Sequence, residues 1–303
     1  MQLPPFLRAL RPHQWSKNVF VLAALGGAWG DRTTQVDLTG PAALRTLCAF
    51  AAFCLGASAI YLVNDLVDVE SDRRHPEKKH RPIASGALSA GAARVEAVLC
   101  ALLAVGLSTF AGKGGLEVTA VVVAYVTMNL AYSLRLKRIV LVDVFCIAAG
   151  FLFRVKAGGL AAGAELSHWL LLCTLFLALF LAFNKRRAEM VELGEERARH
   201  RATLREYDVG FLDQMVTVLA ACTIVCYTLY TVDPDTVAKI GPGNHLVWSV
   251  PFVVFGIARY MLLVHTAGAG GNPTRMFLGG DRWFLLNGLA WLAVVVTVMA
   301  TGL

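Results

Sequence analysis

Three aspartates, Asp65, Asp68 and Asp72, follow an apolar stretch of the chain at a spacing that suits metal chemistry. If the helix of that stretch continues at about 100° per residue, their carboxylates fall within a sector of about 60°, with Asn64 beside them and Glu70 roughly 140° away. Carboxylates so close together repel one another unless a cation neutralises them, and hard oxygen ligands suit Mg²⁺. The spacing therefore predicts a magnesium site; the alternative is a solvated acidic helix end.

A basic loop follows directly, because RRHPEKKHRPIASGALS at residues 73–89 holds five Lys or Arg residues together with His75 and His80. Such a loop beside three carboxylates suits a substrate that carries phosphate. A topological signal alone would explain its charge but not its position next to the aspartates. Arg81 is the candidate phosphate ligand of this loop, since a guanidinium can bind phosphate through two parallel hydrogen bonds.

The composition places these segments in a membrane protein. Of the 303 residues, 57% are hydrophobic and 16% are charged, whereas a soluble domain carries about a quarter charged residues. Base-reading modules and basic tails are absent, so nucleic-acid binding is excluded. We expect an all-α, polytopic membrane protein in which residues 1–303 form a single domain. Apolar runs predict about nine helices, at residues 18–30, 43–66, 90–111, 116–134, 139–158, 168–184, 211–231, 245–265 and 282–301.

Lys and Arg residues concentrate in alternate connections between these helices, which predicts the orientation of the chain. They fill the amino-terminal segment and the segments 66–90, 135–138, 185–210 and 266–282. The intervening connections hold only Arg32, Lys113, Lys156 and Lys239. We therefore expect the amino terminus and the aspartate motif on the cytoplasmic side and the carboxyl terminus outside.

The motif Asn64-Asp65-x-x-Asp68-x-x-x-Asp72, followed by Arg81-Pro82 and set among about nine helices, resembles the UbiA superfamily of intramembrane prenyltransferases. Within it the pattern is most similar to the decaprenyl-phosphate phosphoribosyltransferase branch. The points of likeness are Arg11-Pro12-x-Gln14-Trp15-x-Lys17-Asn18, Tyr132-x-x-x-x-Lys137, Arg154 with Gly158-Gly159, and Lys185-Arg186-Arg187-x-Glu189.

The resemblance implies a helical bundle in a bacterial cytoplasmic membrane, around a cavity that opens sideways to lipid. It implies that Mg²⁺ is held by the aspartate motif, with phosphoribosyl pyrophosphate as donor and a polyprenyl phosphate as acceptor. The product would then feed a lipid-linked pentose donor for envelope polysaccharide. A homo-oligomer is compatible with this arrangement. Two alternatives stay open: transfer of a prenyl group from its diphosphate to a small acceptor, and transport along intramembrane charges.

One departure from the superfamily bears on the donor. A second aspartate-rich motif is usual after the sixth helix, but this chain has NKRRAEMVEL at residues 184–193, with no aspartate. Lys185, Arg186 and Arg187 would suit a donor with an extra phosphate, such as the 5-phosphate of phosphoribosyl pyrophosphate; the alternative is a helix anchor at the headgroups. Glu189 is the one ligand we would name there for a second metal.

Several further residues are candidates for binding substrate. Tyr132 and Lys137 end a predicted helix on the cytoplasmic side, and the family pattern makes both candidate phosphate contacts. Lys17 and Asn18 could reach the same phosphates. Arg154 lies within an apolar segment, where a charge is costly and should be paired or line a cavity. Asp143, eleven residues before it on the same predicted helix, is too distant for a direct pair.

Overall fold

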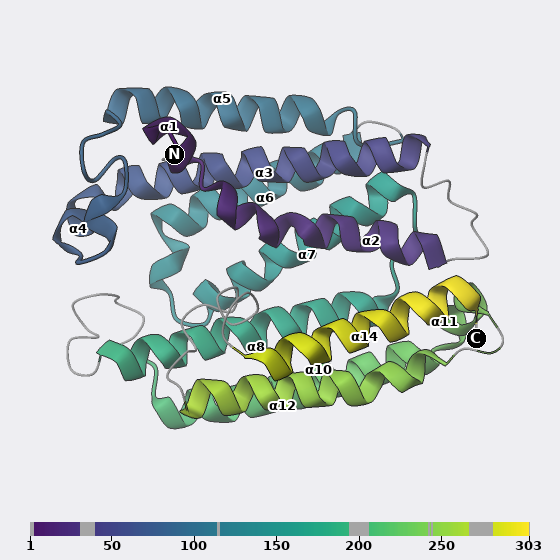
Figure 1. Ribbon diagram of the computed structural model, residues 1–303. Helices are drawn as coiled ribbons and strands as arrows, with labels where there is room; N and C mark the ends of the chain where they lie inside the picture. Colours follow the sequence, from purple (N-terminus) through teal and green to yellow (C-terminus); the bar gives the residue numbers. More distant parts are fainter. Residues whose placement is uncertain are drawn as a thin grey trace. The chain divides into compact units, whose positions relative to one another are not determined.

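The computed structural model describes residues 3–30, 40–113, 116–193, 206–241, 243, 245–266 and 281–302, and these ranges form helices and turns without a strand. Eight helices there are long and apolar enough to cross a membrane. They are α3 (Pro41–Val67), α5 (Ala90–Ser108), α6 (Leu116–Leu134), α7 (Val142–Ala162), α8 (His168–Leu193), α10 (Val209–Val232), α12 (Val250–Thr266, preceded by the turn η6, Leu246–Ser249) and α14 (Arg282–Thr301). The expected all-α membrane architecture is confirmed (Figure 1).

The first expected helix is present but short. It is α2 (Val19–Gly30), with 12 residues, and it extends about 18 Å at 1.5 Å per residue, less than the roughly 30 Å of a hydrocarbon core. Before it come α1 (Pro5–Ala9) and the turn η1 (Pro12–Asn18). The short elements elsewhere are α4 (Val69–Arg74), η2 (Lys78–His80), η3 (Leu136–Arg138) and α11 (Pro234–Ile240).

The chain forms two compact units. Met1–Ala28, Val36–Lys137 and Phe153–Glu165 make up the first, and Trp29–Gln35, Arg138–Leu152 and Leu166–Leu303 make up the second. The single domain over residues 1–303 stays a prediction. Some of the basic residues used above for orientation lie outside the described residues: Arg32, Arg197, Arg199, Arg201, Arg205 and Arg275.

In the first unit, α3 runs beside α5 and also packs on α6 (Figure 1). Ala49, Ala52 and Ala104 are fully buried there, because small side chains let membrane helices approach closely. The tightest approach is at Gly158, where a Cβ atom would lie 2.0 Å from the carbonyl oxygen of Val21. Only glycine therefore permits this crossing of α7 and α2.

In the second unit, α8 runs beside α10, and α12 runs beside α14 (Figure 1). Its core is aromatic as well as aliphatic, and Phe180, Phe183 and Tyr207 are buried in it. Tyr207 precedes α10, so its burial fixes the start of that helix against α8 through the contact of its ring with Phe183.

Two helix boundaries differ from those expected and both affect the site. The helix expected to end at residue 184 continues as α8 to Leu193, so Lys185 and Glu189 lie on a helix. The helix that carries the aspartate motif stops after Val67 and resumes as α4, with Asp68 between them at φ −96° and ψ 8°. The prediction of one continuous helix through the motif is therefore wrong.

Candidate active site

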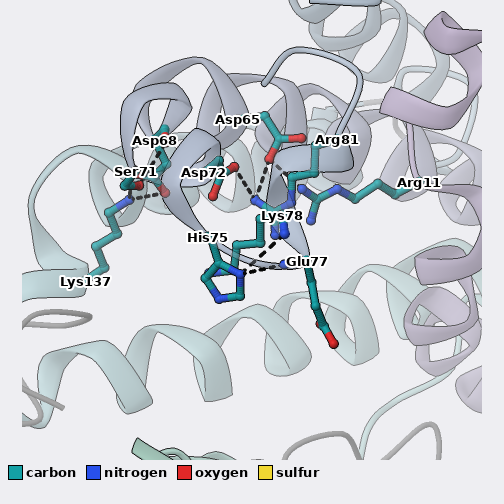
Figure 2. Close-up of polar contacts among 10 residues, drawn as sticks. All are labelled: Arg11, Asp65, Asp68, Ser71, Asp72, His75, Glu77, Lys78, Arg81 and Lys137. Atoms are coloured by element: carbon teal, nitrogen blue, oxygen red, sulfur yellow. Dashed lines mark hydrogen bonds and ion pairs between the residues drawn. The ribbon is translucent and has the colours of Figure 1, made fainter. Parts of the chain in front are cut away.

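The interruption at Asp68 separates the three motif carboxylates into a buried pair and a more accessible third. Asp65, from the last turn of α3, and Asp72, from α4, are 2% and 3% exposed, whereas the side chain of Asp68 is 38% exposed. Figure 2 shows Asp65 and Asp72 directed toward Arg81, and Asp68 directed toward Lys137. The buried pair and the accessible carboxylate therefore have different partners.

Arg81 joins the two buried carboxylates. Its Nη1 atom lies 3.1 Å from Asp65 Oδ1 and 2.6 Å from Asp72 Oδ2. Asp65 Oδ1 also accepts a hydrogen bond of 2.5 Å from Nη2 of Arg11, so two guanidinium groups share one carboxylate oxygen (Figure 2). The structure thus brings Asp65 and Asp72 together with Arg81 and Arg11, whereas the spacing had grouped Asp65 and Asp72 with Asp68.

Lys137 reaches the third carboxylate from the short turn η3, which follows α6. Its Nζ atom lies 2.8 and 2.9 Å from the two oxygens of Asp68. Glu70 turns away from the motif, as predicted: its side chain is 69% exposed and pairs with Arg73. Residues 64–72 therefore hold three aspartates that pair with basic side chains outside this stretch and one glutamate that lies on the surface.

The carboxylates fit a magnesium ion that is shared with a substrate. Among the described residues, no three His, Cys, Asp or Glu side chains are grouped closely enough to hold a metal by themselves. Oxygens of Asp65 and Asp72 nevertheless converge on a single cationic nitrogen, which shows that the pair can bind one positive centre. Mg²⁺ is usually bound by one or two carboxylates, substrate phosphates and water rather than by a complete protein cage. The donor set suits this mode.

Arg154 lies in a buried polar cluster of the first unit and is 6% exposed. Its Nε donates to Asn18 Oδ1 at 2.7 Å and its Nη2 to the hydroxyl of Tyr125 at 2.9 Å. The guanidinium also lies over the ring of Tyr125, 4.8 Å from the centroid. The cost of this intramembrane charge is thus offset by hydrogen bonds and an aromatic face. The structure brings Asn18 and Arg154 together, while Lys17 and Tyr132 are half-buried.

The basic cluster on α8 is mostly engaged with carboxylates of the second unit. Arg186 is 1% exposed, and its Nε lies 2.8 Å from Asp143 Oδ2 while its Nη1 lies 2.5 Å from Glu189 Oε2. Arg187 pairs with Asp213. Lys185 alone of the three is exposed. The three residues are therefore not equivalent, and Lys185 has the position best suited to meet a soluble phosphate.

Tyr207 completes the buried network around Asp143 and was not anticipated. Its hydroxyl donates to Asp143 Oδ1 at 3.0 Å and accepts from the backbone N–H of Leu141 at 2.9 Å. Burial raises the pKa of Tyr207 to about 12, so the phenol stays protonated and remains a donor. Arg11 was likewise missed as a site residue. The only signal in the sequence was the Arg11-Pro12 pair in the basic amino-terminal segment.

The fold and this site define a multi-helix membrane protein in which a buried pair of aspartates is bound by guanidinium groups. Residues 20–205 match the model of the UbiA prenyltransferase family, and the chain belongs to that family. It is therefore a membrane-embedded enzyme of the transferase class.

Relatives and solved structures agree over nearly the full length. The chain is 38% identical to a decaprenyl-phosphate phosphoribosyltransferase of Corynebacterium glutamicum, over 96% of this chain and 85% of that protein. It is 37% identical to the protein of the same name from Mycobacterium tuberculosis, over 98% and 94% of the two chains. The structure of a UbiA homolog from Archaeoglobus fulgidus bound to DMAPP and Mg²⁺ matches with a TM-score of 0.70 at 17% identity, covering 97% and 99% of the chains. The last likeness shows the fold alone.

Proposed function

We propose that this enzyme transfers 5-phosphoribose from phosphoribosyl pyrophosphate to a polyprenyl phosphate and releases pyrophosphate, at the cytoplasmic face of a bacterial membrane. The observation that carries the proposal is the 37–38% identity, over almost the whole chain, to relatives named for this acceptor and this transfer. The replacement of a second acidic motif by Lys185 and its neighbours supports it, because positive charge there suits a donor with an additional phosphate.

In this reaction an oxygen of the acceptor phosphate attacks C1 of the ribose, and the bond from C1 to pyrophosphate breaks. The acceptor oxygen is already ionised, so no general base is required. When bound, Mg²⁺ supplies charge neutralisation on the departing pyrophosphate. Asp65 and Asp72 would hold that ion, Arg81 would stabilise the charge that develops on the leaving group, and Lys185 would bind the 5-phosphate.

The acceptor phosphate is assigned to Lys137, Lys17 and Tyr132. Lys137 is the residue that the geometry supports best, because its ammonium lies against Asp68 at the edge of the buried pair. The polyprenyl chain would extend sideways into the bilayer, since an apolar tail is more stable in lipid than in water. The protein's main contribution is then to bring a lipid phosphate and a soluble donor into line.

The test is transfer of label into lipid. Purified protein is incubated with Mg²⁺, ribose-labelled phosphoribosyl pyrophosphate and a polyprenyl phosphate, and the organic phase is counted. Label should enter lipid and should stop entering it with EDTA. Lys185→Ala should weaken donor binding by about one to two decades, the worth of one charge-assisted contact. If no sugar label reaches lipid while a prenyl diphosphate is consumed with a phenolic acceptor, prenyl transfer replaces this proposal.

The cytoplasmic placement is tested separately by labelling single cysteines from outside the cell, in a background without the native cysteines. Arg74 on α4 and Asp235 on α11 are both exposed, so accessibility to the reagent depends on the side of the membrane. Arg74→Cys should resist a membrane-impermeant reagent, whereas Asp235→Cys should react. Reaction at position 74 from outside would overturn the orientation and the cytoplasmic site together.

A further inference from the structure

Each motif aspartate is bound to a basic side chain from another segment of the first unit. Arg11 belongs to the amino-terminal segment, Arg81 to the loop after α4, and Lys137 to the turn η3. Their nitrogens lie 2.5–3.1 Å from carboxylate oxygens (Figure 2). Three carboxylates therefore face three cationic side chains, and the formal charges of the two sets cancel.

These ion pairs compete with the binding of Mg²⁺, the role proposed above for Asp65 and Asp72. Mg²⁺ binds carboxylate oxygens at about 2.0–2.1 Å, and it would compete with Arg81 for the negative charge of Asp65 and Asp72. A divalent ion and a guanidinium also repel each other at contact distance. Metal binding therefore weakens the hold of these carboxylates on Arg81, and a diphosphate offers its guanidinium an equivalent partner.

Arg11 is positioned for the same exchange by a strained backbone. Its φ angle is 53°, in the left-handed region that a residue with a side chain rarely occupies. The segment is held on α3 by Ser58, whose hydroxyl donates to Leu10 O at 2.8 Å and accepts from Trp15 Nε1 at 3.1 Å. Arg8 also donates to His80 O at 3.2 Å, which ties this segment to the loop that carries Arg81. The two guanidinium groups thus come from segments that touch.

We propose that Arg11 and Arg81 are exchangeable counter-ions, which pass from Asp65 and Asp72 to the donor's diphosphate when the metal binds and so make metal and diphosphate binding mutually dependent. This rests on the proposed function for the identity of the site, and it assigns Arg11 to the donor site. Metal alone adds charge to a neutral cluster and displaces basic groups that then lack a partner. Diphosphate alone places its negative charge beside three carboxylates. When metal and diphosphate bind together, the carboxylates hold the metal and the basic side chains hold the diphosphate.

The exchange predicts effects of opposite sign in one variant. Arg81→Gln removes a competitor for the carboxylates and a ligand for the diphosphate. The variant should bind Mn²⁺ alone about 10- to 100-fold more tightly than the wild type, and should bind pyrophosphate in the presence of saturating Mn²⁺ more weakly by a similar factor. Arg11→Gln should change both affinities in the same directions. Arg74→Gln is the matched control, since Arg74 is an exposed basic residue at the end of α4, and should change neither.

Mn²⁺ binding is measured on the full chain in nanodiscs from the electron paramagnetic resonance signal of free Mn²⁺. Pyrophosphate binding is measured by equilibrium dialysis of the ³²P-labelled anion. A loss of both affinities in Arg81→Gln, or an Mn²⁺ affinity equal to that of the wild type, would overturn the exchange. Because the probes are Mn²⁺ and pyrophosphate, the result does not depend on the donor. Label transfer without the opposed effects would refute the exchange alone, and opposed effects without label transfer would refute the proposed function alone.

Discussion

Arg186 provides a direct test of how buried charge stabilises this protein. Arg186 and Asp143 are 1% and 0% exposed and are 2.8 Å apart, so Arg186→Met leaves the Asp143 carboxylate in the interior without the guanidinium that neutralises its charge. Removing one partner of a buried pair typically costs about 3–5 kcal/mol, whereas replacing both by apolar residues of similar volume is often neutral. The double variant Asp143→Leu/Arg186→Met should therefore recover most of the stability that Arg186→Met loses.

The assay is thermal unfolding in detergent, followed by a dye that reacts with thiols exposed on unfolding, since the structure places seven free cysteines in buried or half-buried positions. At about 2–4 °C per kcal/mol, Arg186→Met should lower Tm by roughly 6–20 °C. Lys185→Met is the matched control: Lys185 is exposed, and its substitution should change stability by about 0.5 kcal/mol or less. Equal Tm values for the Arg186 and Lys185 variants, or a double variant less stable than Arg186→Met, would refute this account of the pair.

Three further outcomes are expected. Asp65→Asn removes a carboxylate of the buried pair and should reduce turnover at least about 100-fold, a barrier increase of about 2.7 kcal/mol. Glu70→Gln should keep the wild-type turnover. Similar losses of turnover in both variants would contradict the role of the buried aspartates. Gly158→Ala should cost about 1–3 kcal/mol by overpacking against Val21 O, whereas Gly106→Ala, with no atom within 4 Å of the added Cβ, should not lower Tm. Burial in the folded state raises the pKa of Tyr207 from 10.0 to about 12. The contribution of Tyr207 to folding stability should therefore be present below pH 10 and be lost as pH rises toward 12. A Tyr207→Phe variant with the same alkaline decrease in Tm as the wild type would contradict this.

The arrangement of helices along the chain could be predicted because each helix is a long apolar run bounded by charge. Hydropathy alone does not locate the end of a helix whose last turns are charged. It placed the end of α8 at residue 184, since Lys185 begins a polar stretch, whereas the hydrogen-bonded helix continues to Leu193. The break at Asp68 was missed for a related reason: a continuous helical period was assumed, and no glycine or proline marks the interruption.

The candidate site could be predicted from residue types only in part. Spacing along one segment grouped Asp65, Asp68 and Asp72, but the break in the helix gives Asp68 a different partner, Lys137. The partners of Asp143 are 43 and 64 residues away, at Arg186 and Tyr207, and no local pattern encodes contacts over such separations. Asp143 was considered only as a partner for Arg154 and was judged too distant; the packing of α7, α8 and the start of α10 shows the partners that it has.

The central claim is the transfer of phosphoribose, and a donor labelled at three positions tests it most directly. Phosphoribosyl pyrophosphate is prepared with ¹⁴C in the ribose, ³³P in the 5-phosphate and ³²P in the β-phosphate of the pyrophosphate, and is incubated with the protein, Mg²⁺ and a polyprenyl phosphate. The account predicts that ¹⁴C and ³³P enter the lipid phase in equal amounts and that ³²P remains in the aqueous phase as pyrophosphate. Transfer of ³²P to lipid, or lipid free of both ribose and 5-phosphate label, would contradict it.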